Sequence, residues 1–171
     1  IYAPRPGEAV RLLYGQAFRP PTAYELYYSL ADDDAYPKPN AGLGPETIAA
    51  TTLAWDRFVN AHLRLSGSVF LYRIHDLITL EDDPSDGHQV YANVGNARSR
   101  GAGVEAQYTA ANGADLEASY AFADARDAAT SARLTNSPRH LFKTRIYAPL
   151  AGDRLAAGVE FQYTSRRKTV A

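Results

Sequence analysis

The histidines are the first residues to consider for metal or proton chemistry. The chain has four of them, His62, His75, His88 and His140. No two have the spacing of an HExxH or H-x₃₋₅-H zinc motif. The last three fall in expected loops, which leaves metal binding open, but an ordinary exposed histidine is the simpler interpretation.

Two acidic clusters could attract a hard cation through carboxylate oxygens. They are the run Asp32-Asp33-Asp34 and the pair Asp82-Asp83. Their spacing is not that of a calcium-binding EF-hand loop, so we interpret them as solvated loop acids. The chain has no cysteine, which excludes thiol nucleophiles and cysteine metal sites. No Gly-x-Ser-x-Gly, Walker or nucleophile–base motif is present. The sequence therefore predicts neither an enzyme nor a cofactor.

The most suggestive residues lie in the segment from Gly15 to Asn40, where aromatic rings alternate with charges. Rings next to charged groups on a loop suit a polar, ring-containing ligand. The outer-loop candidates there are Phe18, Arg19, Tyr24, Tyr27, Tyr28 and Tyr36. Arg139 and His140, which follow another long link, could approach the same ligand. Packing of each tyrosine against neighbouring loops is the alternative.

Length and charge narrow the class of protein. The 171 residues fit about one domain, and a formal net charge of −1 lacks the basic footprint of a nucleic-acid binder. No apolar run is long enough for a membrane helix, so among integral membrane proteins only the β-barrel remains. The 12 tyrosines suit the aromatic girdles of such a barrel.

Apolar and polar residues alternate strictly in several segments, which predicts an all-β, antiparallel fold of about seven strands and no helix. The expected strands are 9–18, 47–57, 61–74, 102–109, 115–124, 141–148 and 154–165. In this interpretation Val104, Leu116 and Val159 face lipid, while Glu105 and Gln162 face the opposite side.

The expected connections alternate in length. Short turns are expected at 4–8, 58–60, 110–114 and 150–153, and long polar links at 19–44, 76–100 and 125–139. This alternation is typical of a transmembrane barrel with long outer loops and short periplasmic turns. Gly101 and Gly103 would then mark entry into a strand. Pairing Pro149 with Arg154 across the last turn would place Lys143 opposite Glu160. A soluble β-sandwich remains the alternative.

Several segments together resemble the β-barrel of TonB-dependent outer-membrane receptors. They are YGQAFRPPTAYEL (Tyr14–Leu26), LGPET (Leu43–Thr47), VFLYRIHDLI (Val69–Ile78), YANVGNARSRGAGVE (Tyr91–Glu105), SYAFADARD (Ser119–Asp127) and RLTNSPRHLFKTRI (Arg133–Ile146). The similarity covers nearly the whole chain and is strongest to ferric-siderophore and colicin receptors.

The resemblance implies an integral β-barrel of the Gram-negative outer membrane that binds a ferric siderophore at its outer loops. It implies two further partners, the TonB complex, which acts through a plug domain, and outer-membrane lipid with lipopolysaccharide. Residues 1–171 would be an internal fragment of the barrel domain, without the plug or the closing strands. The alternatives are a cobalamin or heme receptor of the same family, a passive porin, and a secreted β-sandwich that binds carbohydrate.

Overall fold

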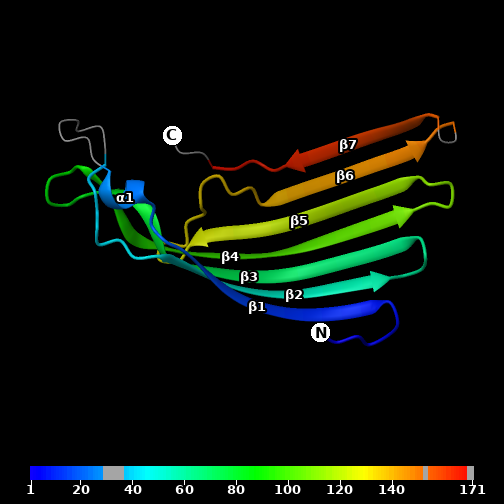
Figure 1. Cartoon of the computed structure of the whole chain (residues 1–171), viewed down its shortest axis with the longest axis horizontal. Coiled ribbons are helices and arrows are strands. Elements are labelled where there is room, and N and C mark those ends of the chain that lie inside the picture. The colour runs from blue at the N-terminus through cyan, green and yellow to red at the C-terminus, as the bar shows by residue number, and fades with distance from the viewer. Residues whose placement is uncertain (29–36, 152–153, 169–171) are drawn as a thin grey trace.

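The computed structural model describes residues 1–28, 37–151 and 154–168 of the chain. Seven antiparallel strands form one sheet in chain order, each pairing with the next (Figure 1). The strands are β1 (Glu8–Arg19), β2 (Glu46–Phe58), β3 (Leu63–Asp82), β4 (Gln89–Thr109), β5 (Asp115–Asp127), β6 (His140–Pro149) and β7 (Ala156–Thr164). A short helix, α1 (Ala23–Tyr27), follows β1. The all-β prediction of seven antiparallel strands is confirmed.

The two ends of the sheet differ as the sequence predicts. Short turns join β2 to β3, β4 to β5 and β6 to β7 at one end, which we call the turn end (Figure 1). The opposite loop end carries α1, the β3–β4 hairpin and the link from β5 to β6. No helix among the described residues is long and apolar enough to cross a membrane.

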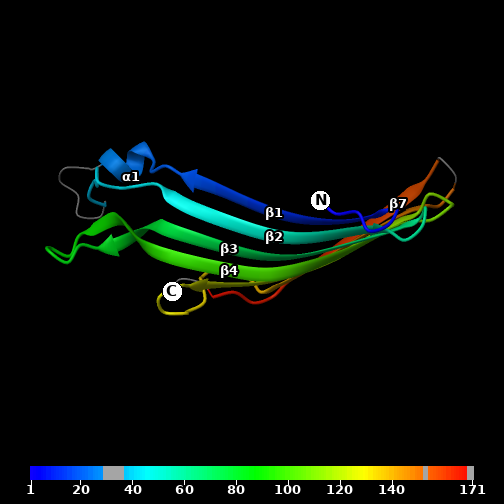
Figure 2. The ribbon, with the colours of Figure 1, turned by 90° about the horizontal axis from the view of Figure 1, so that it is seen from below.

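The strand register sorts side chains onto two faces. Val104 is directly opposite Tyr120, and Glu105 is directly opposite Ser119, so the apolar and polar residues of each strand align across the sheet. The sheet is curved (Figure 2). We call the face of Val104 the convex face and that of Glu105 the concave face.

The sheet has almost no packed core. Among the described residues, Ile78 and Ala97 are the buried hydrophobic residues, and both lie toward the loop end. Convex-face side chains are instead largely exposed, with Val104 at 60% and Val159 at 64%. A β-sandwich buries such a face against a second sheet, and the described residues form a single sheet, so the sandwich alternative is wrong.

The expected long link 76–100 is wrong, because most of it is strand. β3 continues to Asp82 and β4 begins at Gln89, which makes a long hairpin at the loop end. The register between these strands shifts around Leu77, at a β-bulge that follows Asp76 with its φ of 57°. Gly101 and Gly103 consequently lie within β4 and do not mark its start.

The expectation of no helix is also wrong at one place. Thr22 caps α1, since its hydroxyl accepts a hydrogen bond from the Glu25 backbone and the Glu25 carboxylate accepts one from the Thr22 N–H. This is the capping box that a Thr-x-x-Glu sequence permits. It satisfies two backbone N–H groups that a single helical turn leaves without partners.

The predicted register between the last two strands is wrong by two residues. Pro149 pairs with Ala156 and not with Arg154, so Lys143 lies opposite Gln162, and Glu160 lies opposite Arg145. The Leu150 N–H donates to the Leu155 carbonyl at 2.8 Å, which closes a longer turn than the sequence suggested. A shift of two residues conserves the faces, so Lys143 and Glu160 still share the concave face.

Candidate functional site

A clamp of charged residues fixes α1 to the loop end of the sheet. The Arg19 guanidinium donates to both Glu46 carboxylate oxygens at 2.8 Å and to the Glu25 carboxylate at 3.1 Å. Glu46 also accepts a hydrogen bond from the Ile78 backbone N–H at 2.9 Å. A guanidinium held by two carboxylates is a rigid, directional link. It ties β1, β2 and β3 to the helix.

The clamp keeps Glu25 ionised. Hydrogen bonds from the Arg19 guanidinium, and then from the Thr22 backbone N–H, hold the pKa of the Glu25 carboxyl below its ordinary value. The carboxylates of Glu25 and Glu46 together engage the positive charge of Arg19. The candidate anion-binding role of Arg19 therefore competes with a positioning role in the folded loop.

Three tyrosines form what we call the tyrosine platform, Tyr24, Tyr28 and Tyr91. The rings of Tyr24 and Tyr28 are stacked with centroids 4.7 Å apart, and Tyr24 meets Tyr91 of β4 edge-on at 6.3 Å. Tyr27, also in α1, is 68% exposed. The arrangement offers ring faces and hydroxyl groups at the loop end, which suits a ligand with rings and polar edges.

Two asparagines attach the platform to the β3–β4 hairpin. The Asn40 side chain donates to the Tyr91 carbonyl at 2.8 Å, while the Asn40 N–H donates to the Glu25 carbonyl at 3.4 Å. The Asn93 amide exchanges hydrogen bonds with the backbone of Gly44 and also donates to the Asp76 carbonyl. The tyrosines are therefore presented by a loop that is bonded to two strands.

The structure does not bring the other candidate residues to this platform. Phe18 alternates with Arg19 and lies on the convex face, opposite Thr47. Arg139 donates to Asp124 at 2.7 Å, and His140 is hydrogen-bonded to the Tyr120 hydroxyl at 2.7 Å. Asp124 and Tyr120 both belong to β5. Arg19 and Tyr91, which contact α1, belong to β1 and β4 and not to β5. Tyr36 and the run Asp32–Asp34 lie outside the described residues.

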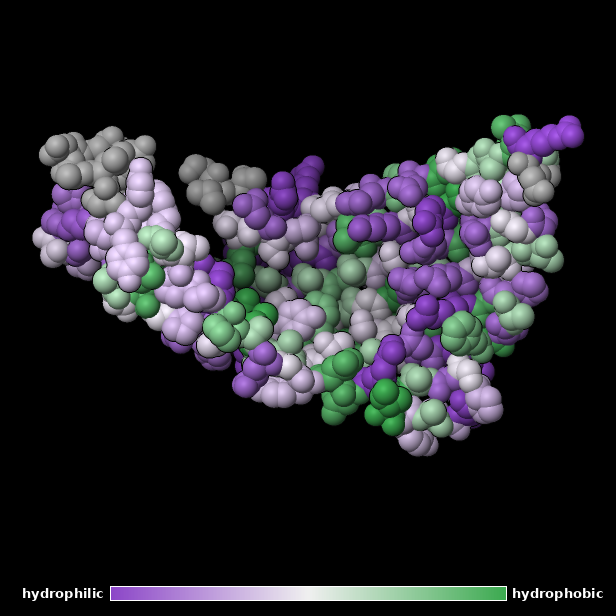
Figure 3. Space-filling view, viewed as in Figure 1, coloured by the Kyte–Doolittle hydropathy of each residue, from purple (hydrophilic) through white to green (hydrophobic). Residues whose placement is uncertain are grey.

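A second polar region lines the concave face near the turn end, and we call it the charged belt. Hydrophilic side chains gather over this half of the sheet in the face that Figure 3 shows. The belt consists of charged side chains from β1 to β7: Arg11, Asp56, Arg64, Glu105, Glu117, Lys143, Arg145 and Glu160.

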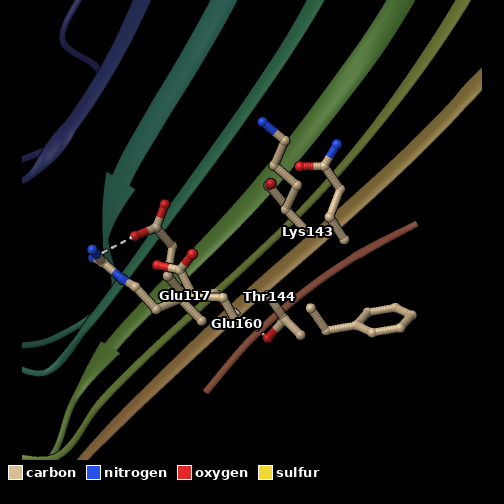
Figure 4. A pocket seen from close by; sticks show the side chains of 8 residues that line it. Glu117, Lys143, Thr144 and Glu160 are labelled. Atoms are coloured by element: carbon tan, nitrogen blue, oxygen red, sulfur yellow. Dashed lines mark hydrogen bonds and ion pairs between the residues drawn. The ribbon is translucent and has the colours of Figure 1, made fainter. Parts of the chain in front are cut away.

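Ion pairs cross the belt between neighbouring strands. Asp56 accepts from Arg11 of β1 and from Arg64 of β3, the latter at 2.9 Å. Arg145 donates to Glu117 at 2.8 Å, as the dashed line in Figure 4 marks. Beside this pair, Lys143 and Glu160 border a pocket of about 430 Å³ (Figure 4). A half-cylinder lined by paired charges can hold a polar molecule or a polar protein segment, but it offers no nucleophile–base arrangement.

The described residues contain no group of three or more His, Cys, Asp or Glu side chains that could hold a metal ion. Asp83 accepts hydrogen bonds from Ser85 and lies 3.5 Å from the Lys38 ammonium, so its charge is engaged within the loop.

Sequence reasoning missed Tyr91 and the ion pairs that cross the charged belt. Alternation places Glu105, Lys143 and Glu160 on the polar face, but the one pairing it suggested, Lys143 with Glu160, is wrong by two residues. Tyr91 lay in the segment expected to be a loop.

Comparison with known families gives one match that spans the chain. The β-barrel of TonB-dependent receptor-like proteins matches residues 1–171. Comparison with curated proteins finds no match.

Solved structures share the fold at low sequence identity. The alcaligin outer-membrane receptor FauA of Bordetella pertussis is 22% identical, with a TM-score of 0.65 over 96% of this chain and 28% of its own. The FrpB iron transporter of Neisseria meningitidis is 16% identical, with a TM-score of 0.71 over 95% and 25%. The copper transporter OprC is 17% identical, with a TM-score of 0.67 over 91% and 23%. The chain spans about a quarter of the length of these proteins.

Proposed function

We propose that this chain, which belongs to the TonB-dependent receptor family, forms part of an outer-membrane receptor that imports a ferric siderophore. The observation that carries the proposal is the family match over residues 1–171 together with a sheet that exposes an apolar convex face and a charged concave face. An apolar band outside and a polar lumen inside are what a transmembrane barrel requires. The reaction is transport, with no covalent step.

The proposal assigns different tasks to the two polar regions. The tyrosine platform, at the loop end, is the part of this chain that would meet a ligand arriving from outside. The charged belt, at the turn end, would line the lumen and face the plug domain that the family implies. Energy from the TonB complex would act on that plug, outside the residues of this chain.

The choice of ligand is supported by the chemistry of the platform. Siderophore complexes are bulky and commonly carry aromatic rings, which Tyr24, Tyr27 and Tyr28 could contact face to face. The iron transporters among the similar structures agree with this choice at the level of fold. Cobalamin and heme receptors of the same family, and a passive porin, are the alternatives.

A binding titration separates these ligands. The purified full-length receptor is titrated with a ferric catecholate, a ferric hydroxamate, cobalamin and heme, while its intrinsic fluorescence is monitored. We expect saturable binding of one ferric siderophore and none of cobalamin or heme. Saturation by cobalamin or heme alone would replace the proposed ligand, and no saturation by any of the four would favour the porin.

A further inference from the structure

The Arg19 guanidinium has every one of its hydrogen-bond donors engaged. A guanidinium carries five N–H groups in a planar fork. Arg19 makes five hydrogen bonds, two to the Glu46 carboxylate at 2.8 Å and three to the Glu25 carboxylate at 3.1 to 3.3 Å. The Ile78 N–H holds Glu46 and the Thr22 N–H holds Glu25. An anionic ligand would have to displace one of these two anchored carboxylates to reach Arg19.

The second basic residue near the tyrosine platform, Lys38, is engaged in the same way. We call the part of the chain around the platform the platform region, which the structure describes at residues 19–28, 37–46 and 75–96. Arg19 and Lys38 are the basic residues of these three stretches. The Lys38 ammonium pairs with Asp86 and lies 3.5 Å from the Asp83 carboxylate. Each cation of the platform region is thus held by two carboxylates.

The platform region carries more acids than these cations can balance. Its described residues include seven carboxylates and two basic side chains, which gives a formal charge of −5. Asp76, Glu81 and Asp82 have no basic partner among the described residues, and all three are exposed. Asp82 lies on the same face of the hairpin as Tyr91, because Tyr91 is directly opposite Leu80, two residues away. The excess negative charge therefore lies beside the rings.

The arginines that β3 and β4 carry next along the sheet project from its other face. Arg98 alternates in step with Val104, on the convex face, and Arg73 is directly opposite Arg98. Arg19, which holds α1, alternates in step with Arg11 of the charged belt, on the concave face. Arg73 and Arg98 are therefore not placed to contact a ligand that lies on the platform.

We propose that the tyrosine platform takes a ferric siderophore complex without net negative charge, either neutral or positive. The inference rests on the proposed function and narrows its class of ligand. An anionic complex would meet unbalanced carboxylates and no free cation of the platform region, whereas ring faces attract cationic groups. A ferric trihydroxamate meets this requirement, because three singly charged hydroxamates balance the ferric ion. A ferric tris-catecholate, whose three ligand groups are doubly charged, does not.

The test uses the purified full-length receptor and three ferric complexes of one linear trihydroxamate that differ only at the chain end. The first ends in an ammonium, the second in an acetylated amine and the third in a succinylated amine. Their net charges are therefore positive, zero and negative, with the same iron centre. A ferric tris-catecholate is the fourth probe. Dissociation constants are measured by fluorescence quenching at low salt and at about 0.5 M salt, where charge effects are screened.

At low salt we expect the negative hydroxamate complex to bind about fivefold more weakly than the positive one, because several carboxylates at about 10 Å still repel it. The neutral complex should fall between them, and the tris-catecholate should bind most weakly. High salt should reduce the difference. Glu81→Gln/Asp82→Asn should reduce it as well. Asp115→Asn/Glu160→Gln is the matched control, since it removes two carboxylates near the turn end that have no ion-pair partner among the described residues, and it should leave the difference unchanged.

Three results would overturn the inference. They are equal binding of the three hydroxamates at low salt, tighter binding of the negative complex or of the tris-catecholate, and a charge preference that both variant pairs change equally or that neither changes. Thermal unfolding of each variant shows whether it is folded, and Asp82→Asn alone replaces the test pair if that pair melts early. Binding of none of the four probes by the parent would instead refute the proposed function, and the inference with it.

Discussion

Phe70 of β3 covers Gly101, its direct partner on β4. A Cβ atom added at Gly101 would lie 2.5 Å from the Phe70 Cζ and 2.2 Å from the backbone oxygen of Phe122. The ring occupies the space that a side chain would need, and the second contact is with backbone, which cannot rotate away. Glycine is therefore required at this position for steric reasons.

The first prediction concerns this contact. Gly101→Ala should destabilise the full-length receptor by about 1–3 kcal/mol, the usual cost of overpacking. Gly103→Ala is the matched control, because an added Cβ there lies no closer than 3.6 Å to its nearest neighbour, Ser68 Oγ. Denaturant unfolding in detergent measures both variants. Equal stabilities of the two variants would contradict the close approach of Phe70 and β5 to Gly101.

The second prediction tests which face meets lipid. Arginine in place of Val104, Leu116 or Val159 on the convex face should cost about 2–4 kcal/mol near the bilayer midplane. Glu105→Arg and Gln162→Arg, on the concave face, should cost far less, because their side chains meet water in the lumen. Refolding of the full-length variants into liposomes gives the free energies of unfolding. Similar costs on both faces would exclude the assignment of the convex face to lipid.

The third prediction follows from the lowered pKa of Glu25. A carboxyl whose pKa is lower in the folded loop stabilises that loop above its unfolded pKa and loses this effect as the pH falls through the folded value. We expect the α1 region to be fully attached near pH 7 and to loosen below the ordinary glutamate pKa of 4.5. Hydrogen exchange of residues 22–28, corrected for intrinsic rates, measures the attachment.

Glu25→Gln should produce the loosened state of α1 at pH 7, whereas Glu117→Gln, which removes a carboxylate from the charged belt, should leave α1 unchanged. Exchange in the parent that stays equally slow at pH 3.5 and pH 7 would show that the clamp does not depend on the Glu25 charge.

The fourth prediction tests the tyrosine platform as the ligand contact. Tyr27→Ala with Tyr28→Ala should weaken siderophore binding by about 1–3 kcal/mol, the scale of a modest binding hot spot. Phe18→Ala is the control, because Phe18 is comparably exposed but lies on the convex face. Titration of both full-length variants decides the point. An unchanged affinity in the tyrosine variant, or an equal loss in the Phe18 variant, would move the binding site elsewhere.

Alternation predicted the strands well where they cross the proposed hydrocarbon, as in β5, because lipid on one side and water on the other enforce a period of two. Alternation failed to predict the strand segments nearer the loop end. Residues 76–100 carry polar groups on both faces of the β3–β4 hairpin, so the sequence there has no clear alternation and was expected to be a loop.

The candidate site was only partly predictable for a different reason. Arg19 has the chemistry of an anion ligand, and only the three-dimensional structure shows that Glu25 and Glu46 engage it. Arg73, Arg98 and Arg126 are far apart in the sequence, so only the strand register shows that they lie directly opposite one another.

Uptake of radioactive iron is the most direct test of the central claim, that this chain is part of a receptor for energy-dependent siderophore import. Cells that carry the full-length gene as their only receptor for the ferric siderophore are compared with and without a functional TonB protein. The account predicts saturable uptake that disappears when TonB is removed, although binding at the cell surface remains. Uptake that continues without TonB and rises linearly with ligand concentration would contradict the account and indicate passive diffusion through a pore.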